Sequence, residues 1–508
     1  MSANFEQFLN ASRQYNTIPV FERFFVDTMT PIQIFQKLHH HACFILESND
    51  STSPWANFSF IGLDPFIVLK EENGQFVSRT RNGSVIAEHE RFRNALLQTI
   101  ASLKPMPIHM QIPFTGGAVG YISYDGITEF DKTFKPHPHH DITLPRFHFS
   151  FCETIIAYDH KLKEITIITH IFIQHKKNRQ HLKKLYDNAM KKIREIVKHL
   201  LSAEQEASPI FQLPHATNDV NFNDIQSNFT KEAFLKSVKK IKQHIQKGEI
   251  LQAVISQRFE RKIAVDGLEI YRALRVINPS PYLFFLKIDD FEVVGSSPEK
   301  LIQVNKNQIE IHPIAGTRRR GKTNEEDKKL AEELLQDEKE RSEHLMLVDL
   351  AKKEIAQVAK QNTVAVQSLM KIGYFSHVMH MISKVAGTLA DHCDPIDALI
   401  AAFPAGTLTG APKRRAMEMI YDVEPTARNL YGGAIGYIGF DGNIDSCIAI
   451  RTILIKNQTA YVQAGAGIVA NSVPENEWEE TRNKAKALIQ SIAVAEQLFN
   501  AEGVSHHV

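Results

Sequence analysis

The chain has 508 residues, which at about 150 residues per domain suggests two to four domains. Lys and Arg number 59 and Asp and Glu number 58, so the formal net charge of +1 argues against nucleic-acid binding through bulk charge. No apolar stretch approaches the roughly 20 residues that span a bilayer, and the start lacks the basic and apolar regions of a signal peptide. We therefore expect a cytoplasmic protein with no membrane or nucleic-acid partner.

Short β-rich runs separated by turns fill the first part of the chain. Residues 42–46 and 58–61 predict strands, and residues 154–158 and 164–169 predict a hairpin, because β-branched residues flank a five-residue polar turn. The basic stretch that follows predicts a helix with a solvated Lys and Arg face, and RNA binding is the weaker interpretation. Its apolar residues lie at helical spacing: Leu182, Leu185, Ala189, Ile193 and Val197.

One segment occurs twice, 316 residues apart. Residues 116–126 read GGAVGYISYDG and residues 432–442 read GGAIGYIGFDG, with eight of eleven positions identical. Two related β elements explain this better than coincidence, with glycines that allow close backbone approach. We expect a partial internal duplication.

A phosphate-loop pattern, GxxxxGK[ST], runs from Gly316 to Thr323. An apolar segment that ends in Asp349 is similar to the strand whose aspartate helps to hold magnesium in nucleotide hydrolases. Two features favour another interpretation. Asp349 lies within a segment of helical spacing, and Thr323 with Glu326 forms a T-x-x-E helix cap that needs no metal. A nucleotide hydrolase remains as an alternative of a different class.

The C-terminal half concentrates polar groups among glycines. A turn-rich segment ends at Lys413, and Arg451 lies within an apolar run. Residues 463–467, QAGAG, expose backbone N–H groups, and Glu477 and Glu480 share one face of a predicted helix at about 473–499. Singly, each has a structural explanation, but together they indicate a site for a small polyanion bound to a hard cation.

From about residue 230 to 495 the chain resembles the chorismate-utilising enzymes, and among them the anthranilate synthase component I family. The matching segments are 278–282 (NPSPY), 295–299 (GSSPE), 313–318 (PIAGTR), 343–349 (EHLMLVD), 374–380 (YFSHVMH), 403–413, 431–437, 463–469 and 472–481. Short matches at 46–48 (LES) and 59–62 (SFIG) extend the resemblance toward the N-terminus.

The resemblance implies a Mg²⁺-dependent carbon–oxygen lyase that makes anthranilate and pyruvate from chorismate and ammonia in tryptophan biosynthesis. It implies Glu343 and Glu480 as magnesium ligands, with Glu477 one turn away as a helper. It implies Glu299, His380 and Thr407 as catalytic residues, Glu299 being the acid that assists loss of the ring hydroxyl. The implied substrate-binding residues are Gly316, Thr317, Lys413, Tyr431, Arg451, Gly465, Ala466 and Gly467.

Two positions distinguish this chain from related enzymes that convert chorismate to other products. Aminodeoxychorismate synthases carry a nucleophilic lysine where this chain has Ala315, and isochorismate and salicylate synthases carry a water-activating lysine where it has Gln252. Both differences favour anthranilate formation, with aminodeoxychorismate synthase component I, of the para-aminobenzoate branch, as the alternative.

We expect a partner subunit to supply the ammonia. None of the cysteines, Cys43, Cys152, Cys393 and Cys447, has glycine beside it, whereas a glutaminase needs a reactive cysteine in a tight glycine turn. Their wide spacing also argues against a disulfide framework or a zinc site. The resemblance implies a heteromeric complex with a glutamine amidotransferase subunit.

The resemblance also implies feedback inhibition by L-tryptophan, bound by Ser48, Pro281, Tyr282 and Leu283, and a tryptophan-sensing subunit without activity is a further alternative. Three departures from the family stand out: Leu283 replaces a methionine, Asn57 replaces an arginine, and residues 349–354 read DLAKKE in place of DLxRND.

We expect an α+β fold of layered antiparallel β-sheets flanked by helices, the chorismate-utilising enzyme fold. The expected portions are an N-terminal regulatory portion at 1–207, a connector at 208–228, a catalytic portion at 229–497 and a tail at 498–508.

Overall fold

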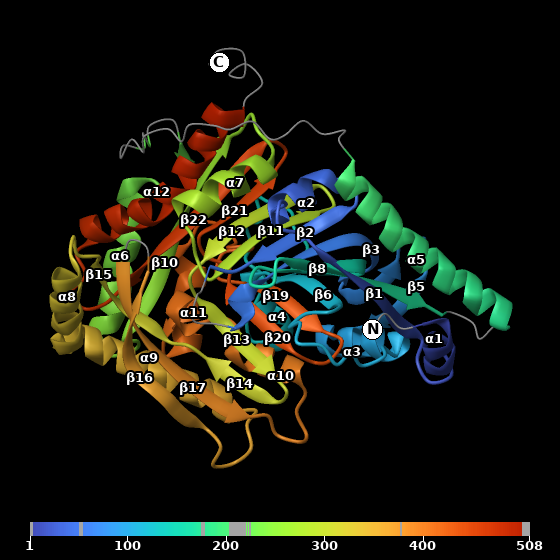
Figure 1. Cartoon of the computed structure of the whole chain (residues 1–508). Helices are drawn as coiled ribbons and strands as arrows, with labels where there is room; N and C mark the ends of the chain where they lie inside the picture. Colours follow the sequence, from blue (N-terminus) through green and yellow to red (C-terminus); the bar gives the residue numbers. More distant parts are fainter. Residues whose placement is uncertain are drawn as a thin grey trace, which may run out of the picture.

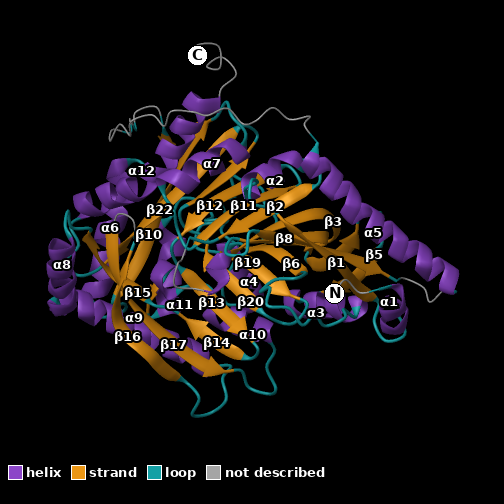
Figure 2. Cartoon of the chain, viewed as in Figure 1, coloured by secondary structure: helices purple, strands orange, loops and turns teal. Residues whose placement is uncertain are grey.

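The computed structural model describes residues 4–49, 54–173, 178–202, 220, 222, 225–375 and 378–499. Antiparallel strands form its centre and helices lie on the outside (Figures 1 and 2). The expected α+β architecture of layered antiparallel sheets is confirmed. Most of the predicted connector and the tail beyond Phe499 lie outside the described residues.

Two arms of strands diverge from the paired strands β3 (Phe58–Glu72) and β7 (Phe147–Asp159). The first arm continues from β3 through β2 (Ala42–Glu47), β11 (Tyr282–Ile288), β12 (Phe291–Ser297), β21 (Thr452–Lys456), β22 (Thr459–Ile468) and β10 (Gln252–Lys262). The second continues from β7 through β6 (Gly117–Ile122), β19 (Ala434–Gly439), β20 (Ile444–Ile448), β13 (Lys300–Asn305), β14 (Gln308–Ile311) and β17 (Val378–Thr388), which also pairs with β15 (Ile314–Arg319) and β16 (Ala365–Tyr374).

The remaining strands complete the sheet. They are β1 (Thr17–Phe25), β8 (Glu164–Phe172), β4 (Gln75–Thr80), β5 (Val85–His89), β9 (Gln226–Ser227) and β18 (Gly410–Ala411). The predicted hairpin is confirmed, since Thr154 pairs with Thr169 and Asp159 with Glu164.

The helices cover the outer faces of the two arms. One core cluster packs the first arm against α1 (Phe5–Ala11), α2 (Pro31–Lys37), α5 (Arg179–Leu201), α7 (Gly267–Ile277) and α12 (Pro474–Phe499). A second packs the other arm against α3 (Phe92–Leu103), α9 (Glu338–Ala356) and α10 (Pro395–Ala402). The remaining α-helices are α4 (Ile127–Phe130), α6 (Lys231–Gln246), α8 (Asn324–Gln336) and α11 (Lys413–Val423).

The basic stretch forms α5, which runs along the outside of the molecule (Figure 1). Leu182, Ala189 and Ile193 are buried against the sheet, as the spacing predicts. Its lysines and arginines are exposed except Lys192, which pairs with Asp64 and Glu153 of the sheet, so the solvated-face interpretation accounts for the rest of the basic residues.

The two copies of the repeated segment pair with each other. Strands β6 and β19 are neighbours, and Gly120 lies opposite Gly436, its own equivalent in the repeat. A Cβ atom at Gly120 would come within 1.8 Å of the His148 carbonyl oxygen, and one at Gly436 within 2.1 Å of the Asp445 carbonyl oxygen. The predicted close backbone approach is confirmed.

The phosphate-loop pattern does not form a phosphate-binding loop. Residues Ile314–Arg319 form strand β15, and Asp349 lies in the middle of helix α9. Thr323 caps α8 by accepting a hydrogen bond from the Glu326 N–H. The structure therefore gives no support to a nucleotide hydrolase.

The two predicted portions share one sheet. The pairs β2–β11 and β6–β19 each join a strand from the first 207 residues to a strand from the second half. None of the described helices is long and apolar enough to cross a membrane.

Candidate active site

A cavity of about 790 Å³ lies where β10, β15, β17, β22, α9 and α12 meet. It brings together most of the site residues that the sequence predicted, although they lie between positions 299 and 480 of the chain. The predicted site residues that line it are Glu299, Gly316, Thr317, Glu343, His380, Thr407, Tyr431, Arg451, Gly465, Gly467, Glu477 and Glu480.

Glu299 lies in the turn between β12 and β13, and its carboxylate accepts a 2.8 Å hydrogen bond from the Thr407 hydroxyl. Burial raises the pKa of Glu299 to about 7, and the bond from Thr407 partly opposes that rise. A carboxyl group with this pKa is protonated in about half of the molecules at neutral pH, whereas an ordinary glutamate is almost fully ionised, so Glu299 can act as a general acid.

His380 lies on β17 directly opposite Thr317 of β15. Its Nδ1 is 2.9 Å from the Gly316 carbonyl oxygen, which can only accept, so Nδ1 carries the hydrogen. Burial lowers the pKa of His380, which favours the neutral ring. The lone pair is therefore on Nε2, at the other edge of the ring.

Arg451 follows β20 and has a left-handed backbone with φ of +50°. Its Nη1 donates to the Lys484 carbonyl oxygen at 2.6 Å, and no carboxylate pairs with it among the described residues. Burial lowers the pKa of Arg451, because a cation that is removed from water without an anionic partner is less stable in its charged form. A guanidinium in this state favours an anionic ligand in the cavity.

Tyr431 and Gly465 form the wall beside Arg451. A Cβ atom at position 465 would come within 2.6 Å of the Tyr431 hydroxyl and 2.8 Å of the Ile255 carbonyl oxygen, so only glycine fits there. Ala466, also predicted to contact the substrate, does not line the cavity, because side chains alternate along β22 and that of Ala466 is completely buried in a core cluster.

Glu343 on α9 and Glu477 and Glu480 on α12 face the same cavity from two helices. Burial raises the pKa values of Glu343 and Glu477, and the charge of Glu480 raises both further. Among the described residues no three His, Cys, Asp or Glu side chains are grouped as a metal site. Mg²⁺ is commonly bound by one or two carboxylates plus water and substrate oxygens, so Glu343 and Glu480 fit such an ion with the substrate present.

Lys484 also lines the cavity, and the sequence analysis missed it. Its Nζ is 2.7 Å from Glu480 and donates to the Gly465 carbonyl oxygen at 2.9 Å. The sequence could have indicated Lys484, because it follows Glu480 by four residues on the same predicted helix, and this spacing places both side chains on one face.

Lys413, predicted to contact the substrate, does not line the cavity. Its Nζ pairs with the nearly buried Glu354 at 3.0 Å. Glu354 belongs to the segment that departs from the family pattern, and Lys353 of that segment pairs with Asp349 at 2.7 Å. The departure from the family pattern thus coincides with local salt bridges. The cationic side chains that line the cavity are Lys339, Arg451 and Lys484.

Both positions that separate sister activities face the cavity. Gln252 and Ala315 line it, so a lysine at either position would lie within the site.

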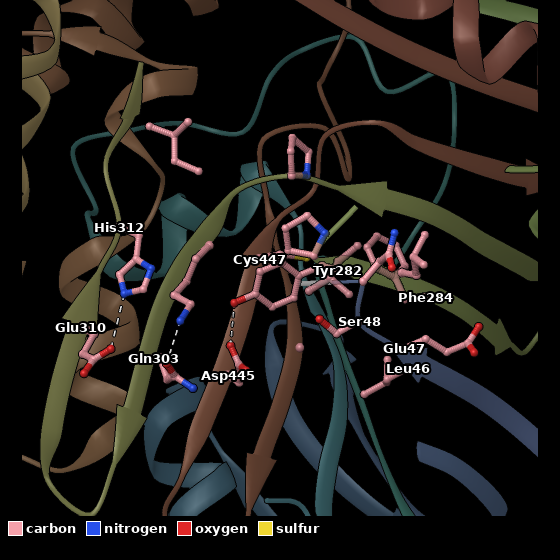
Figure 3. Close-up of a pocket in the computed structure, with 18 of the residues that line it drawn as sticks. Leu46, Glu47, Ser48, Tyr282, Phe284, Gln303, Glu310, His312, Asp445 and Cys447 are labelled. Atoms are coloured by element: carbon pink, nitrogen blue, oxygen red, sulfur yellow. Dashed lines mark hydrogen bonds and ion pairs between the residues drawn. The ribbon is translucent and has the colours of Figure 1, made fainter. Parts of the chain in front are cut away.

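A second cavity of about 500 Å³ lies between the two arms (Figure 3). All four predicted effector residues line it: Ser48, Pro281, Tyr282 and Leu283. The two cavities share a wall formed by Pro281, Pro298, Ile314 and Phe375.

Comparisons with known proteins agree with this geometry. The family described as chorismate binding enzyme matches residues 42–490. Anthranilate synthase component 1 from Geobacillus stearothermophilus is 50% identical over 493 residues, covering 97% of each chain. The crystal structure of anthranilate synthase component I from Streptococcus pneumoniae TIGR4 superposes with a TM-score of 0.71 at 35% identity, covering 92% of this chain and 99% of that one. The menaquinone-specific isochorismate synthase from Escherichia coli, at 17% identity and a TM-score of 0.67, covers 96% of this chain and 98% of its own and shares the fold.

Proposed function

The chain belongs to the chorismate binding enzyme family, and from this premise we propose that it converts chorismate and ammonia to anthranilate and pyruvate, as the large subunit of an anthranilate synthase. We propose that it does so in the cytoplasm. The observation that carries the proposal is the half-buried guanidinium of Arg451, which has no carboxylate partner among the described residues, in a cavity that Glu343 and Glu480 also line. This set fits a small carboxylate that binds together with a divalent cation.

In the proposed reaction the chain's own residues bind the substrate and move protons. Arg451 pairs with a substrate carboxylate, and Tyr431 and Gly465 hold the ring against the wall. Glu299 donates its proton to the ring hydroxyl as it leaves, because hydroxide is a poor leaving group. Ammonia adds to the ring, and His380 serves the later elimination of pyruvate through Nε2.

We propose that Glu343 and Glu480 hold Mg²⁺, with Glu477 close by. The ion would supply electrostatic binding of the ring carboxylate when present. Burial raises the pKa values of Glu343 and Glu477, and the charge of Glu480 adds to the rise; a cation among the three carboxylates would relieve this repulsion, which supports the assignment.

The para-aminobenzoate branch is the second candidate. A nucleophilic lysine at position 315 would face the cavity, and the chain has alanine there. Lys484 is held by Glu480 and Gly465 and is therefore not a free amine.

We propose that a separate glutamine amidotransferase subunit supplies ammonia. Three cysteines, Cys43, Cys152 and Cys447, are buried. Burial raises the pKa values of Cys152, Cys393 and Cys447, which disfavours the reactive thiolate. A name such as component 1 among the relatives also implies a second component.

We propose that L-tryptophan binds in the second cavity and inhibits the enzyme. This cavity combines apolar walls with polar side chains, which suits an aromatic amino acid. The shared residues Pro281, Pro298, Ile314 and Phe375 give a short path along which an effector could alter the catalytic cavity.

Product analysis tests the proposal. The purified chain with chorismate, ammonium and Mg²⁺ should form fluorescent anthranilate, and with glutamine in place of ammonium it should form none. An Arg451→Gln variant should raise KM for chorismate, whereas Arg275→Gln, which removes a cation outside this cavity, is the control. Aminodeoxychorismate as the product would favour the second candidate, and tryptophan binding without any product would favour a sensor subunit.

A further inference from the structure

A buried arginine lies directly behind the catalytic cavity. Arg428 follows helix α11 and precedes strand β19, is only 3% exposed, and does not itself line the cavity. Its guanidinium pairs with the Glu424 carboxylate through two parallel bonds, from Nε to Oε2 at 2.8 Å and from Nη2 to Oε1 at 2.7 Å. The same carboxylate accepts from the N–H and the hydroxyl of Ser256, at 2.7 and 2.8 Å. Glu424 therefore holds the planar guanidinium in one orientation.

The other N–H groups of Arg428 reach two backbone segments of the cavity wall. Nη1 donates to the Leu408 carbonyl oxygen and Nη2 to the Val254 carbonyl oxygen, each at 2.7 Å. Leu408 and Val254 both line the cavity. Leu408 directly follows Thr407 in a three-residue 3₁₀ turn, Gly406–Leu408. Arg428 thus ties the turn that carries Thr407 to strand β10.

Two tyrosine rings pack against the same guanidinium. The Arg428 Cζ is 5.5 Å from the ring centre of Tyr431, which lines the cavity, and 4.6 Å from the ring centre of Tyr124. Both distances are within the roughly 6 Å over which a cation is attracted to an aromatic face. Tyr124 belongs to the first copy of the repeated segment, so the N-terminal portion of the chain also contacts this arginine.

A buried ion pair that only stabilises the fold would not need contacts with the cavity wall. Arg146 gives the comparison, because two of its nitrogens also pair with one carboxylate, that of Glu71. Its further contact is the Thr128 hydroxyl, and neither Arg146 nor its two partners line the cavity. Beyond Glu424, by contrast, Arg428 contacts three residues that do.

We propose that Arg428 is a positioning residue of the reaction, whose rigid guanidinium fixes the ring of Tyr431 relative to the turn that carries Thr407. The Thr407 hydroxyl donates to Glu299, so the same cation sets the place of the proposed acid. Lysine would not replace it, because a single ammonium group lacks the planar fork that reaches a carboxylate and two carbonyl oxygens at once. The inference rests on the proposed function for the identity of the reaction.

The test is anthranilate formation by Arg428→Lys as a function of pH and of chorismate concentration, at a constant concentration of uncharged ammonia. The variant should lower kcat/KM by about 10- to 100-fold, because small displacements of positioned groups are costly. KM for chorismate should rise several-fold as the Tyr431 ring moves.

The pH dependence reports on the acid itself. Burial raises the pKa of Glu299, and the Thr407 bond and the charge of Lys484 lower it. Lys484 is held by Glu480 and Gly465 on the far side from this network, so the variant should act through Thr407. A weaker Thr407 bond should move the descending limb of kcat/KM to higher pH by about half a unit or more.

Two further variants separate positioning from stability, with thermal unfolding as the measure of folding. Arg146→Lys removes a matched arginine fork outside the cavity and should keep the limb and KM of the parent. The double variant Glu424→Gln with Arg428→Met leaves neither buried charge without its partner, so it should fold even if Arg428→Lys does not. It should show the same shifts in the limb and in KM.

The outcomes separate this inference from the proposed function. A moved limb and a raised KM in the Arg428 variants, but not in Arg146→Lys, support it. If a folded Arg428 variant keeps the limb and KM of the parent, the arginine only stabilises the fold; the inference is overturned and the proposed function stands. The same shifts in Arg146→Lys would also overturn it, because they would then report a general loosening. If the parent forms no anthranilate, both fail.

Discussion

The hydrogen bond from Thr407 to Glu299 gives a quantitative prediction for Thr407→Val. The parent acid has a pKa of about 7, which burial raises and the Thr407 bond lowers. A hydrogen bond to a charged group contributes about 1.5–3 kcal/mol, and 1.4 kcal/mol corresponds to about one pKa unit. The variant should therefore raise the pKa of Glu299 by about one unit or more.

The sign of the effect on rate follows from the role of Glu299 as a proton donor. Activity requires the protonated form, so kcat/KM falls as pH rises through the pKa of the free enzyme. In the parent this limb should lie near pH 7, and in Thr407→Val it should move to higher pH.

The assay is anthranilate fluorescence between pH 6 and 9, at a constant concentration of uncharged ammonia so that substrate supply does not change with pH. Thr409→Val is the matched control, because the Thr409 hydroxyl donates to the Ala405 carbonyl oxygen at 3.1 Å and has no bond to Glu299. An unchanged limb in Thr407→Val, or the same limb retained in Glu299→Gln, would refute the assignment of Glu299 as the acid.

Three further predictions follow from the same structure. Glu343→Gln should reduce turnover roughly 100-fold at moderate Mg²⁺ while leaving the fold intact, and Glu338→Gln, on the same helix but not lining the cavity, should not; equal rates in Glu343→Gln and the parent would remove the metal assignment. Gly436→Ala should lower the free energy of unfolding by about 1–3 kcal/mol, because its Cβ would approach the Asp445 carbonyl oxygen, and thermal unfolding measures this; an unchanged midpoint would contradict the close approach. Ser48→Ala should relieve tryptophan inhibition with turnover unchanged, as measured by inhibition curves, and equal inhibition would discard the effector site.

Local patterns in the sequence predicted much of the fold. The hairpin of β7 and β8 and the helix α5 follow from alternation and helical spacing, which depend only on neighbouring residues. The repeat predicted two related β elements, but not that Gly120 and Gly436 would pair, because pairing depends on the path of the chain between them.

The site was predicted less completely than the fold. Residues whose backbone or short side chain forms the cavity, such as Gly316 and Gly465, lie where the resemblance implied. Long side chains were harder to place, because the end of a lysine can reach several neighbours: Lys413 is turned to Glu354, and Lys484, which was missed, reaches the cavity.

The most direct test of the central claim is a crystal structure of the chain with Mg²⁺ and chorismate. We expect one ion between the carboxylates of Glu343 and Glu480, at about 2.0–2.1 Å from its oxygen ligands, and a chorismate carboxylate paired with Arg451. An ion bound elsewhere, or a covalent bond from the Nζ of Lys484 or Lys339 to the ring, would contradict the account.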